Sequence, residues 1–308
     1  MIDLSEMYTV RMRYPFKVEN YVRYHGRVNF GQGGQAHDVM DVIKEFGMVP
    51  YEAYTGKTWD KDRHNHSELG SVLKGMIDAV IKRRNPTPVW KKAVDKVLDV
   101  YMGEVPAEFT YEGKTYTPKS FAKETGLNPD DYVEITSYTH HPFYEKFILE
   151  IPDNYDNSFY YNVPVDELMN IIDNALENGY SVAFDGDVSD KFFFGKKGYA
   201  VVPEDRLDTE AEEPEKEVQV TQKMRQEQFD NFKITDDHLM HLTGIAKNQE
   251  GTKFYYTKNS WGAESKGKER QFKGYWYMSE QYVRLSTIAI MVHKDAIPAA
   301  IRTKLNIK

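Results

Sequence analysis

The chain has no cysteine among its 308 residues. This absence excludes disulfide bonds and thiolate metal sites within the sequence. It favours neither a reducing nor an oxidising compartment, because cysteine-free proteins occur in both. The sequence also lacks a run of about eighteen apolar residues, the length that a transmembrane helix requires. We therefore expect no membrane-spanning segment, no bound metal and no other cofactor.

Positive charge is also in short supply. Lys and Arg number 40 against 48 Asp and Glu, which gives a net charge of -8. No global positive field attracts nucleic acid, so we expect no nucleic-acid partner. The first residues have neither the basic nor the apolar region of a signal peptide, and we expect a cytoplasmic protein unless the chain begins further upstream. The hydrophobic share of 40% is typical of a folded globular protein.

Apolar periodicity divides the chain into a helical part and a β-rich part. Ser5, followed by an apolar run, is predicted to cap a helix. Helical spacing predicts helices over residues 38–46, 69–84, 88–102 and 165–178. Strand patterns cover residues 132–138, 147–151, 181–184, 239–246, 253–258 and 274–278, and a last apolar segment rich in β-branched residues spans 283–292. The order predicts an α+β fold with two lobes, a mainly helical one over 1–130 and a β-rich one over 131–308.

One segment of the second lobe differs in composition. Residues 204–217 carry eight acidic side chains against Arg206 and Lys216. Such a run is typical of a solvated surface insertion, and this is our prediction. An acidic patch that binds a basic partner is the alternative.

Two histidine pairs and one Asp-rich segment invite comparison with metal sites. The pairs are His64 with His66 and His140 with His141, and the segment covers residues 185–190. No histidine pair has the His-Glu-x-x-His spacing of a zinc site. A calcium loop that began at Asp185 would need Glu at its twelfth position, where Lys196 stands. We therefore predict surface or turn residues, and a contact of Asp187 with a substrate amine stays open.

Two strand patterns around residues 247–251 predict a β-hairpin, with Gly251 available for a positive φ. A turn centred there pairs residues whose numbers sum to about 498–500, which places His238 opposite roughly Asn259–Ser260. Alternate side chains of a strand point to opposite faces, so His238 and His241 are separated. We predict His238 for solvent-side chemistry and His241 for the core.

The sequence Lys258-Asn259-Ser260-Trp261-Gly262, with His238 upstream and Gly274-Tyr275-Trp276-Tyr277 downstream, resembles the C-terminal half of papain-superfamily cysteine peptidases. Gly33-Gly34-Gln35 before a helix resembles the glycine pair of the same superfamily. An insertion at about 55–130, and Arg225 with Phe229 shortly before His238, are similar to the bleomycin hydrolase and aminopeptidase C branch. The resemblance runs from near Asp3 to the C-terminus.

The resemblance implies a papain-like two-lobe fold, with a helical lobe and a β-barrel-like lobe, and a cysteine-type aminopeptidase that removes N-terminal residues from peptides. It assigns His238 as general base, Asn259 as the residue that orients its imidazole, and Trp261 as the indole that shields their hydrogen bond. Gly33 and Gly34 would bind the substrate backbone like an added strand. It also implies a homo-oligomer, a hexamer in which each C-terminus lies in the cleft and limits cleavage to aminopeptidase action. The basic end over residues 302–308 fits that role poorly.

The departure from the family is the missing nucleophile. In the family, the nucleophilic Cys opens a helix upstream of the glycine pair, with an oxyanion-hole Gln before it. Here 32 residues precede Gly33, and none is a cysteine. Neither Ser5 nor Val89-Trp90 is a substitute. We expect a sequence that begins after the catalytic helix, as a truncated gene model, a fragment or a pseudo-enzyme, and an inactive 308-residue chain. The alternative is a catalytically dead papain-like protein for peptide binding or assembly.

Overall fold

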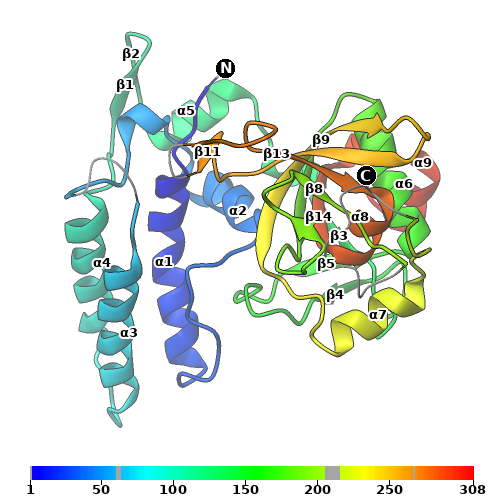
Figure 1. Ribbon diagram of the computed structural model, residues 1–308. Helices are drawn as coiled ribbons and strands as arrows, with labels where there is room; N and C mark the ends of the chain where they lie inside the picture. Colours follow the sequence, from blue (N-terminus) through cyan, green and yellow to red (C-terminus); the bar gives the residue numbers. More distant parts are fainter. Residues whose placement is uncertain (1, 60–63, 205–215, 266–267) are drawn as a thin grey trace. The chain divides into compact units, whose positions relative to one another are not determined.

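A computed structural model describes residues 2–59, 64–204, 216–265 and 268–308 (Figure 1). The chain forms two compact units. Unit 1 comprises Met1–Asp130 and Glu150–Ser158, and unit 2 comprises Asp131–Leu149 and Phe159–Lys308. Residues 150–158, which follow a strand of unit 2, belong to unit 1, although the predicted boundary near residue 130 places them in the second lobe.

Unit 1 is mainly helical, and α3 and α4 pack beside α1 (Figure 1). Ser5 is the N-cap of α1 as predicted, and its Oγ accepts a hydrogen bond from the Tyr8 N–H at 3.0 Å. The elements are α1 (Glu6–Arg23), α2 (Ala36–Phe46), α3 (Ser67–Ile81), α4 (Val89–Met102), β1 (Phe109–Tyr111), β2 (Lys114–Tyr116) and α5 (Pro118–Thr125), with 3-10 turns at Tyr51–Ala53 and Pro129–Asp131.

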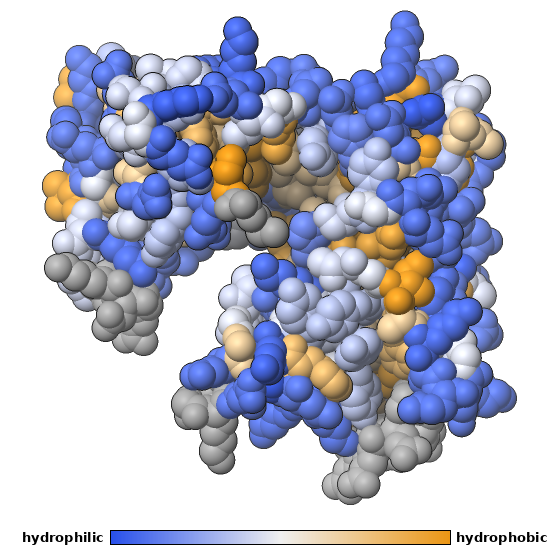
Figure 2. All heavy atoms as spheres, turned by 90° about the horizontal axis from the view of Figure 1, so that it is seen from above, coloured by the Kyte–Doolittle hydropathy of each residue, from blue (hydrophilic) through white to orange (hydrophobic). Residues whose placement is uncertain are grey.

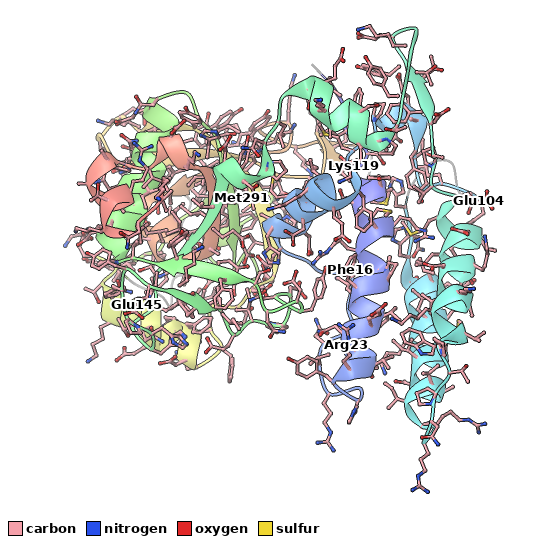
Figure 3. The ribbon with its side chains drawn as sticks, turned by 180° about the vertical axis from the view of Figure 1, so that it is seen from behind. Phe16, Arg23, Glu104, Lys119, Glu145 and Met291 are labelled. Carbon is pink, nitrogen blue, oxygen red and sulfur yellow. The ribbon has the colours of Figure 1, made fainter. Side chains whose placement is uncertain are left out.

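The extent of α1 escaped the sequence analysis because its buried face is polar. Pro15 lies inside the helix, and Arg11, Arg13 and Tyr14 are among its buried residues. Figure 3 labels Phe16 and Arg23 on the same helix. The predicted helices correspond to α2, α3 and α4, whose apolar residues fill two separate cores. One core surrounds Val42 and Phe121, and the other holds Leu73, Ile77 and Leu98.

A buried arginine attaches residues 150–158 to α1. The Arg13 guanidinium contacts Asp38 Oδ1 at 2.7 Å and Asp156 Oδ2 at 2.5 Å. Its Nε donates to the Tyr155 hydroxyl at 2.5 Å, and that hydroxyl donates to Asp38 Oδ1 at 2.7 Å. Charged groups that are buried need such partners, because an unpaired charge in the interior is strongly unfavourable. The network therefore fixes the segment through polar contacts.

Asp156 is held in its charged form by this network. Burial alone would raise the pKa of the Asp156 carboxyl, but a hydrogen bond from His37, at 3.1 Å, and the charge of Arg13 hold the pKa well below its usual range. A carboxyl whose pKa is lower in the folded than in the unfolded chain stabilises the fold above its ordinary pKa. That contribution is lost as the pH falls through the lowered value.

Unit 2 is built on a sheet of ten strands in the order β4-β5-β3-β14-β6-β9-β10-β13-β8-β7. The strands are β3 (Tyr132–Thr136), β4 (Lys146–Ile148), β5 (Phe159–Asn162), β6 (Val182–Gly186), β7 (Phe193–Phe194), β8 (Tyr199–Ala200), β9 (His238–Lys247), β10 (Lys253–Lys258), β13 (Tyr275–Ser279) and β14 (Thr287–His293). A separate pair joins β11 (Glu264–Ser265) and β12 (Lys268–Glu269), and the helices are α6 (Val165–Glu177), α7 (Gln222–Asp230), α8 (Glu280–Ser286) and α9 (Ala299–Lys304).

This architecture confirms the α+β fold class and corrects one part of it. The described sheet begins at β4 and ends at β7 without closing on itself, so it is an open sheet and not a closed barrel. The helix α6 packs against β9 and β6, and it confirms the helix predicted over residues 165–178.

The last apolar segment, residues 283–292, was predicted as β-like, and this is half wrong. Its first part belongs to α8, whose N-cap Ser279 accepts at Oγ from the Tyr282 N–H at 3.1 Å. Its second part belongs to β14, which carries Met291 (Figure 3) and lies between β3 and β6. All but the last residue of β14 are buried. A strand covered on both faces reads as a continuous apolar run, so periodicity could not separate it from the helix before it.

Most of the acidic segment, residues 205–215, lies outside the described ranges. Glu217, at its end, is not solvated as predicted, because its Oε1 accepts from the Val202 N–H at 2.7 Å and from the Ser279 hydroxyl at 2.5 Å. Over the ranges that the structure describes, each helix is too short or too polar to cross a lipid bilayer. The face in Figure 2 is largely hydrophilic, with hydrophobic residues in small patches.

Replacing the buried carboxylate should destabilise unit 1 in a pH-dependent way. We expect Asp156→Asn to lower the free energy of unfolding by about 2 kcal/mol at pH 7, because charged hydrogen bonds to Arg13 and His37 are lost. At pH 3 the difference should be smaller, since protonation of this carboxyl in the unfolded chain then removes part of its stabilising effect. Urea unfolding at both pH values measures this.

Asp130→Asn is the matched control, because the Asp130 carboxylate binds Lys44 in an exposed pair at 2.5 Å. Exposed pairs contribute about 0–1 kcal/mol. Equal losses in the two variants, or a loss in Asp156→Asn that grows as the pH falls, would contradict the assignment.

Candidate active site

The hairpin of β9 and β10 brings His238 and Asn259 to the same end of the sheet. His238 is the first residue of β9, where it pairs with Gly186 of β6. Asn259 follows the last residue of β10, and its N–H donates to the Gly274 carbonyl at 3.0 Å. Since the two strands are antiparallel, the start of one lies beside the end of the other.

The predicted contact is present, but its geometry differs from the prediction. The turn has the expected form, with Gly251 at φ 86°. The β9–β10 ladder contains a shift between Tyr256 and Thr257 and ends with His241 opposite Lys258. His238 therefore lies beyond the ladder and is not directly opposite Asn259, whose side chain reaches it from past the end of β10.

A single hydrogen bond joins the two side chains. His238 Nε2 lies 2.9 Å from Asn259 Oδ1. An amide oxygen can only accept, so Nε2 carries the proton, and in the neutral ring Nδ1 then holds the basic lone pair. Asn259 is 4% exposed, whereas His238 is half-buried. The enclosed Nδ2 of Asn259 has no acceptor among the described residues.

Trp261 lies against the imidazole. The centroids of the Trp261 and His238 rings are 5.0 Å apart, with the ring planes tilted by 36°. Trp261 also meets Trp276 edge to face at 5.6 Å. Trp261 is 41% exposed and Trp276 only 1% exposed. An indole beside a hydrogen bond limits the access of water to it, which strengthens the electrostatic interaction.

The prediction for His241 is wrong. The two histidines do lie on opposite faces of β9, but His241 is the exposed one. His238 shares its face with Met240 and Leu242, which are buried. These two apolar side chains identify the even-numbered positions as the core face and could have been used to assign it.

The turn before β9 is held by two aspartates. Asp187 Oδ1 accepts from the Ser189 N–H at 2.8 Å, and its Oδ2 accepts from the Thr235 N–H at 2.8 Å. This supports the predicted turn and not a contact with a substrate amine, because the carboxylate is buried and already bonded. Asp237, which directly precedes His238 and was given no role in the sequence analysis, accepts from the Val188 N–H at 3.0 Å. This bond ties the start of β9 to the loop that follows β6.

The predicted substrate-binding glycines lie in unit 1 and are packed against carboxylates. A Cβ on Gly33 would lie 1.7 Å from Asp153 Oδ2, and one on Gly34 would lie 2.4 Å from Asp38 Oδ2. The Gly33 carbonyl accepts from Lys17 Nζ. Glycine is thus needed at both positions, because the carboxylates of Asp153 and Asp38 lie where a Cβ would be.

The metal candidates of the sequence have other contacts. His64 Nε2 donates to the Thr55 carbonyl at 2.8 Å. His140 stacks on Phe229, with the centroids 5.7 Å apart, and His141 on Phe147 at 4.2 Å. In unit 1, ligand atoms of His37, Asp38 and Asp156 lie within 4.8 Å of one another. Because Arg13 contacts both of these carboxylates, its positive charge disfavours a metal cation there.

Two curated relatives are similar to this chain. Aminopeptidase G of Lactobacillus delbrueckii subsp. lactis is 24% identical over 305 residues, which cover 90% of this chain and 65% of the relative. Aminopeptidase E of Lactobacillus helveticus is 26% identical over 288 residues, which cover 85% of this chain and 63% of the relative. The chain therefore spans slightly less than two thirds of the length of these relatives.

A solved structure shares the fold of this chain, and a family profile matches most of its length. The crystal structure of PepW from Lactobacillus rhamnosis superposes with a TM-score of 0.71 at 19% identity and covers 99% of this chain and 75% of that one. This match shows a shared fold. The profile of the Peptidase C1-like family matches residues 20–308. The chain therefore belongs to the Peptidase C1-like family, the papain superfamily that the sequence resembled.

Proposed function

We propose that this chain carries the His–Asn part of a cysteine-type aminopeptidase, which removes N-terminal residues from peptides by thiol acyl transfer. The observation that carries the proposal is the 2.9 Å bond from His238 Nε2 to Asn259 Oδ1. It leaves Nδ1 as the basic nitrogen, which is what a neighbouring thiol requires of a general base.

The proposed reaction has two stages. Nδ1 of His238 removes the thiol proton, the thiolate attacks the carbonyl carbon of the first residue, and the imidazolium returns the proton to the departing amine. Water then attacks the thioester, with the same nitrogen taking its proton, and the amino acid leaves while the thiol regains a proton. Asn259 keeps Nε2–H bonded throughout and stabilises the charged ring. The names of the two curated relatives support aminopeptidase chemistry.

This reaction requires a thiol, which the sequence does not contain. We infer that the 308-residue chain alone does not hydrolyse peptides. The same fact favours a second candidate function, a papain-like protein that binds peptides or assembles without turnover. The proposal includes a homo-oligomer, the hexamer that the resemblance implies, and peptides as its ligands.

We include Gly33 and Gly34 in the proposal as the strip that binds the peptide backbone. A strip of this kind pairs with an extended peptide through backbone N–H and C=O groups. The contact from Lys17 to the Gly33 carbonyl, and the carboxylates behind both glycines, support a fixed backbone at this position.

Hydrolysis of aminoacyl coumarin amides tests the proposed function. The 308-residue chain should release no coumarin. The product of the longest reading frame that contains Met1–Lys308 should release it and be inhibited by thiol reagents. In that product, His238→Ala should lower kcat at least about 100-fold, because the general base is removed.

His241→Ala is the matched control, because His241 is the exposed histidine three positions along the same strand. It should leave kcat unchanged. Thiol-sensitive turnover by the 308-residue chain, or an equal effect of the two substitutions, would contradict the assignment. If the product of the longest reading frame binds peptides without cleaving them, the result would favour the second candidate, a papain-like protein without turnover.

A side chain at Gly33 should be tolerated only when Asp153 is removed. We expect Gly33→Ala to lower the free energy of unfolding by about 1–3 kcal/mol, because the new Cβ collides with the Asp153 carboxylate. In an Asp153→Ala background the same change should cost much less. Gly31→Ala is the control, since its Cβ would lie 3.3 Å from the nearest atom, Asn29 Nδ2. Equal costs of Gly33→Ala in the two backgrounds would show that the collision does not matter.

A further inference from the structure

The connection between β10 and β13 is closed at its base by close backbone contacts. The Asn259 N–H donates to the Gly274 carbonyl at 3.0 Å. A Cβ on Gly274 would lie 2.7 Å from the Gly262 carbonyl oxygen, and both glycines have positive φ, 89° and 73°. Glycine is required where backbones approach this closely in such conformations. The base of the connection therefore includes Asn259 itself, together with the residue that follows Trp261.

Arg270, in the same connection, lies near the two indoles. Its backbone N–H donates to the Ala263 carbonyl at 2.7 Å. Its guanidinium carbon lies 5.8 Å from the ring centroid of Trp261 and 5.8 Å from that of Trp276. Both distances lie within the range over which a cation is attracted to an aromatic face. The same cation therefore contacts the exposed indole and the buried one.

The guanidinium of Arg270 contacts the rings of Trp261 and Trp276 and no described carboxylate. Across the ranges that the structure describes, no carboxylate forms an ion pair with its guanidinium, and its Nε is enclosed without an acceptor. By contrast, Lys273 of the same connection pairs with Glu269 at 3.4 Å. A cation that has no carboxylate partner among the described residues and lies 5.8 Å from two indole centroids is placed for the rings and not for an ion pair.

We propose that Arg270 is a positioning residue that holds Trp261 over the His238–Asn259 hydrogen bond. The proposal rests on the proposed function, since it gives Arg270 a role in that site. Trp261 is 41% exposed, so its own burial fixes it weakly, whereas Trp276 is 1% exposed and belongs to the core. Arg270 adds a contact with both rings to the edge-to-face contact that the two indoles make with each other.

Asn259 depends on this arrangement more than its burial suggests. Its amide is held through Oδ1 alone, because Nδ2 has no acceptor among the described residues. An amide with a single hydrogen bond is oriented mainly by the groups packed around it. By fixing Trp261 against the imidazole, Arg270 keeps water from competing for Nε2–H and preserves the orientation of the pair.

The test uses the 308-residue chain and does not depend on turnover. Tryptophan is replaced by 5-fluorotryptophan, the Trp261 signal is assigned with Trp261→Phe, and histidine is labelled with ¹⁵N. Two quantities are measured: the solvent isotope shift of the Trp261 fluorine signal and the exchange rate of the His238 Nε2–H with water. The signal of Trp59, which is 67% exposed, serves as the reference for a solvated indole.

We expect Arg270→Met to move the Trp261 isotope shift toward that of Trp59 and to raise the exchange rate about fivefold or more, as the loss of a cation–π contact implies. Lys273→Met removes the same charge from the same connection without touching an indole, and it should change neither quantity. Arg270→Lys should fall between wild type and Arg270→Met, because a lysine keeps the charge but not the planar guanidinium.

Arg270→Met values that equal those of Lys273→Met would overturn the proposal. If Arg270→Met does not fold, Arg270→Lys decides, and wild-type values in it would also overturn the proposal. Neither quantity requires a nucleophile. A changed isotope shift and exchange rate in the 308-residue chain, together with absent peptidase activity in the product of the longest reading frame, would therefore reject the proposed function and retain the role of Arg270.

Discussion

The antiparallel ladder of β9, β10 and β13 is the constraint on which the candidate site depends. Its hydrogen bonds bring the start of β9 beside the end of β10, and these two points carry His238 and Asn259. The shift in the ladder between Tyr256 and Thr257 decides how the two side chains meet. The site is thus assembled at the ends of two strands, with His238 paired to Gly186 of β6 and Asn259 just past the end of β10.

The hydrogen bond at this end of the sheet has a direction that matters for chemistry. Because Asn259 Oδ1 accepts from the Nε2–H of His238, Nδ1 is the basic nitrogen of the neutral ring. The indole of Trp261 beside the pair limits the access of water. None of these properties requires a thiol, so the proposed general base and the amide that orients it are arranged in a chain without cysteine. In unit 1, Arg13 contacts Asp156 and also Asp38, whose carboxylate lies against Gly34. Both units therefore fix their predicted functional residues through buried polar contacts.

The sequence was sufficient for the pattern-rich parts of the chain. Apolar periodicity located α2, α3, α4 and α6, and the hairpin argument joined His238 to Asn259. It failed where burial and polarity disagree: α1 buries arginines, and the fully covered β14 has no alternating pattern. His241 was assigned to the wrong face because the argument used parity without the apolar positions beside it. Arg270 could not be found at all, since its contacts depend on how the connection between β10 and β13 folds back.

The tautomer of His238 tests the central claim most directly. In the ¹⁵N-histidine-labelled 308-residue chain, nitrogen chemical shifts and two-bond couplings to the ring protons distinguish the two neutral forms. The account predicts that His238 at high pH is the neutral imidazole protonated at Nε2, with Nδ1 bare, and that Asn259→Ala abolishes this preference. A neutral His238 protonated at Nδ1, or a tautomer unaffected by Asn259→Ala, would contradict it.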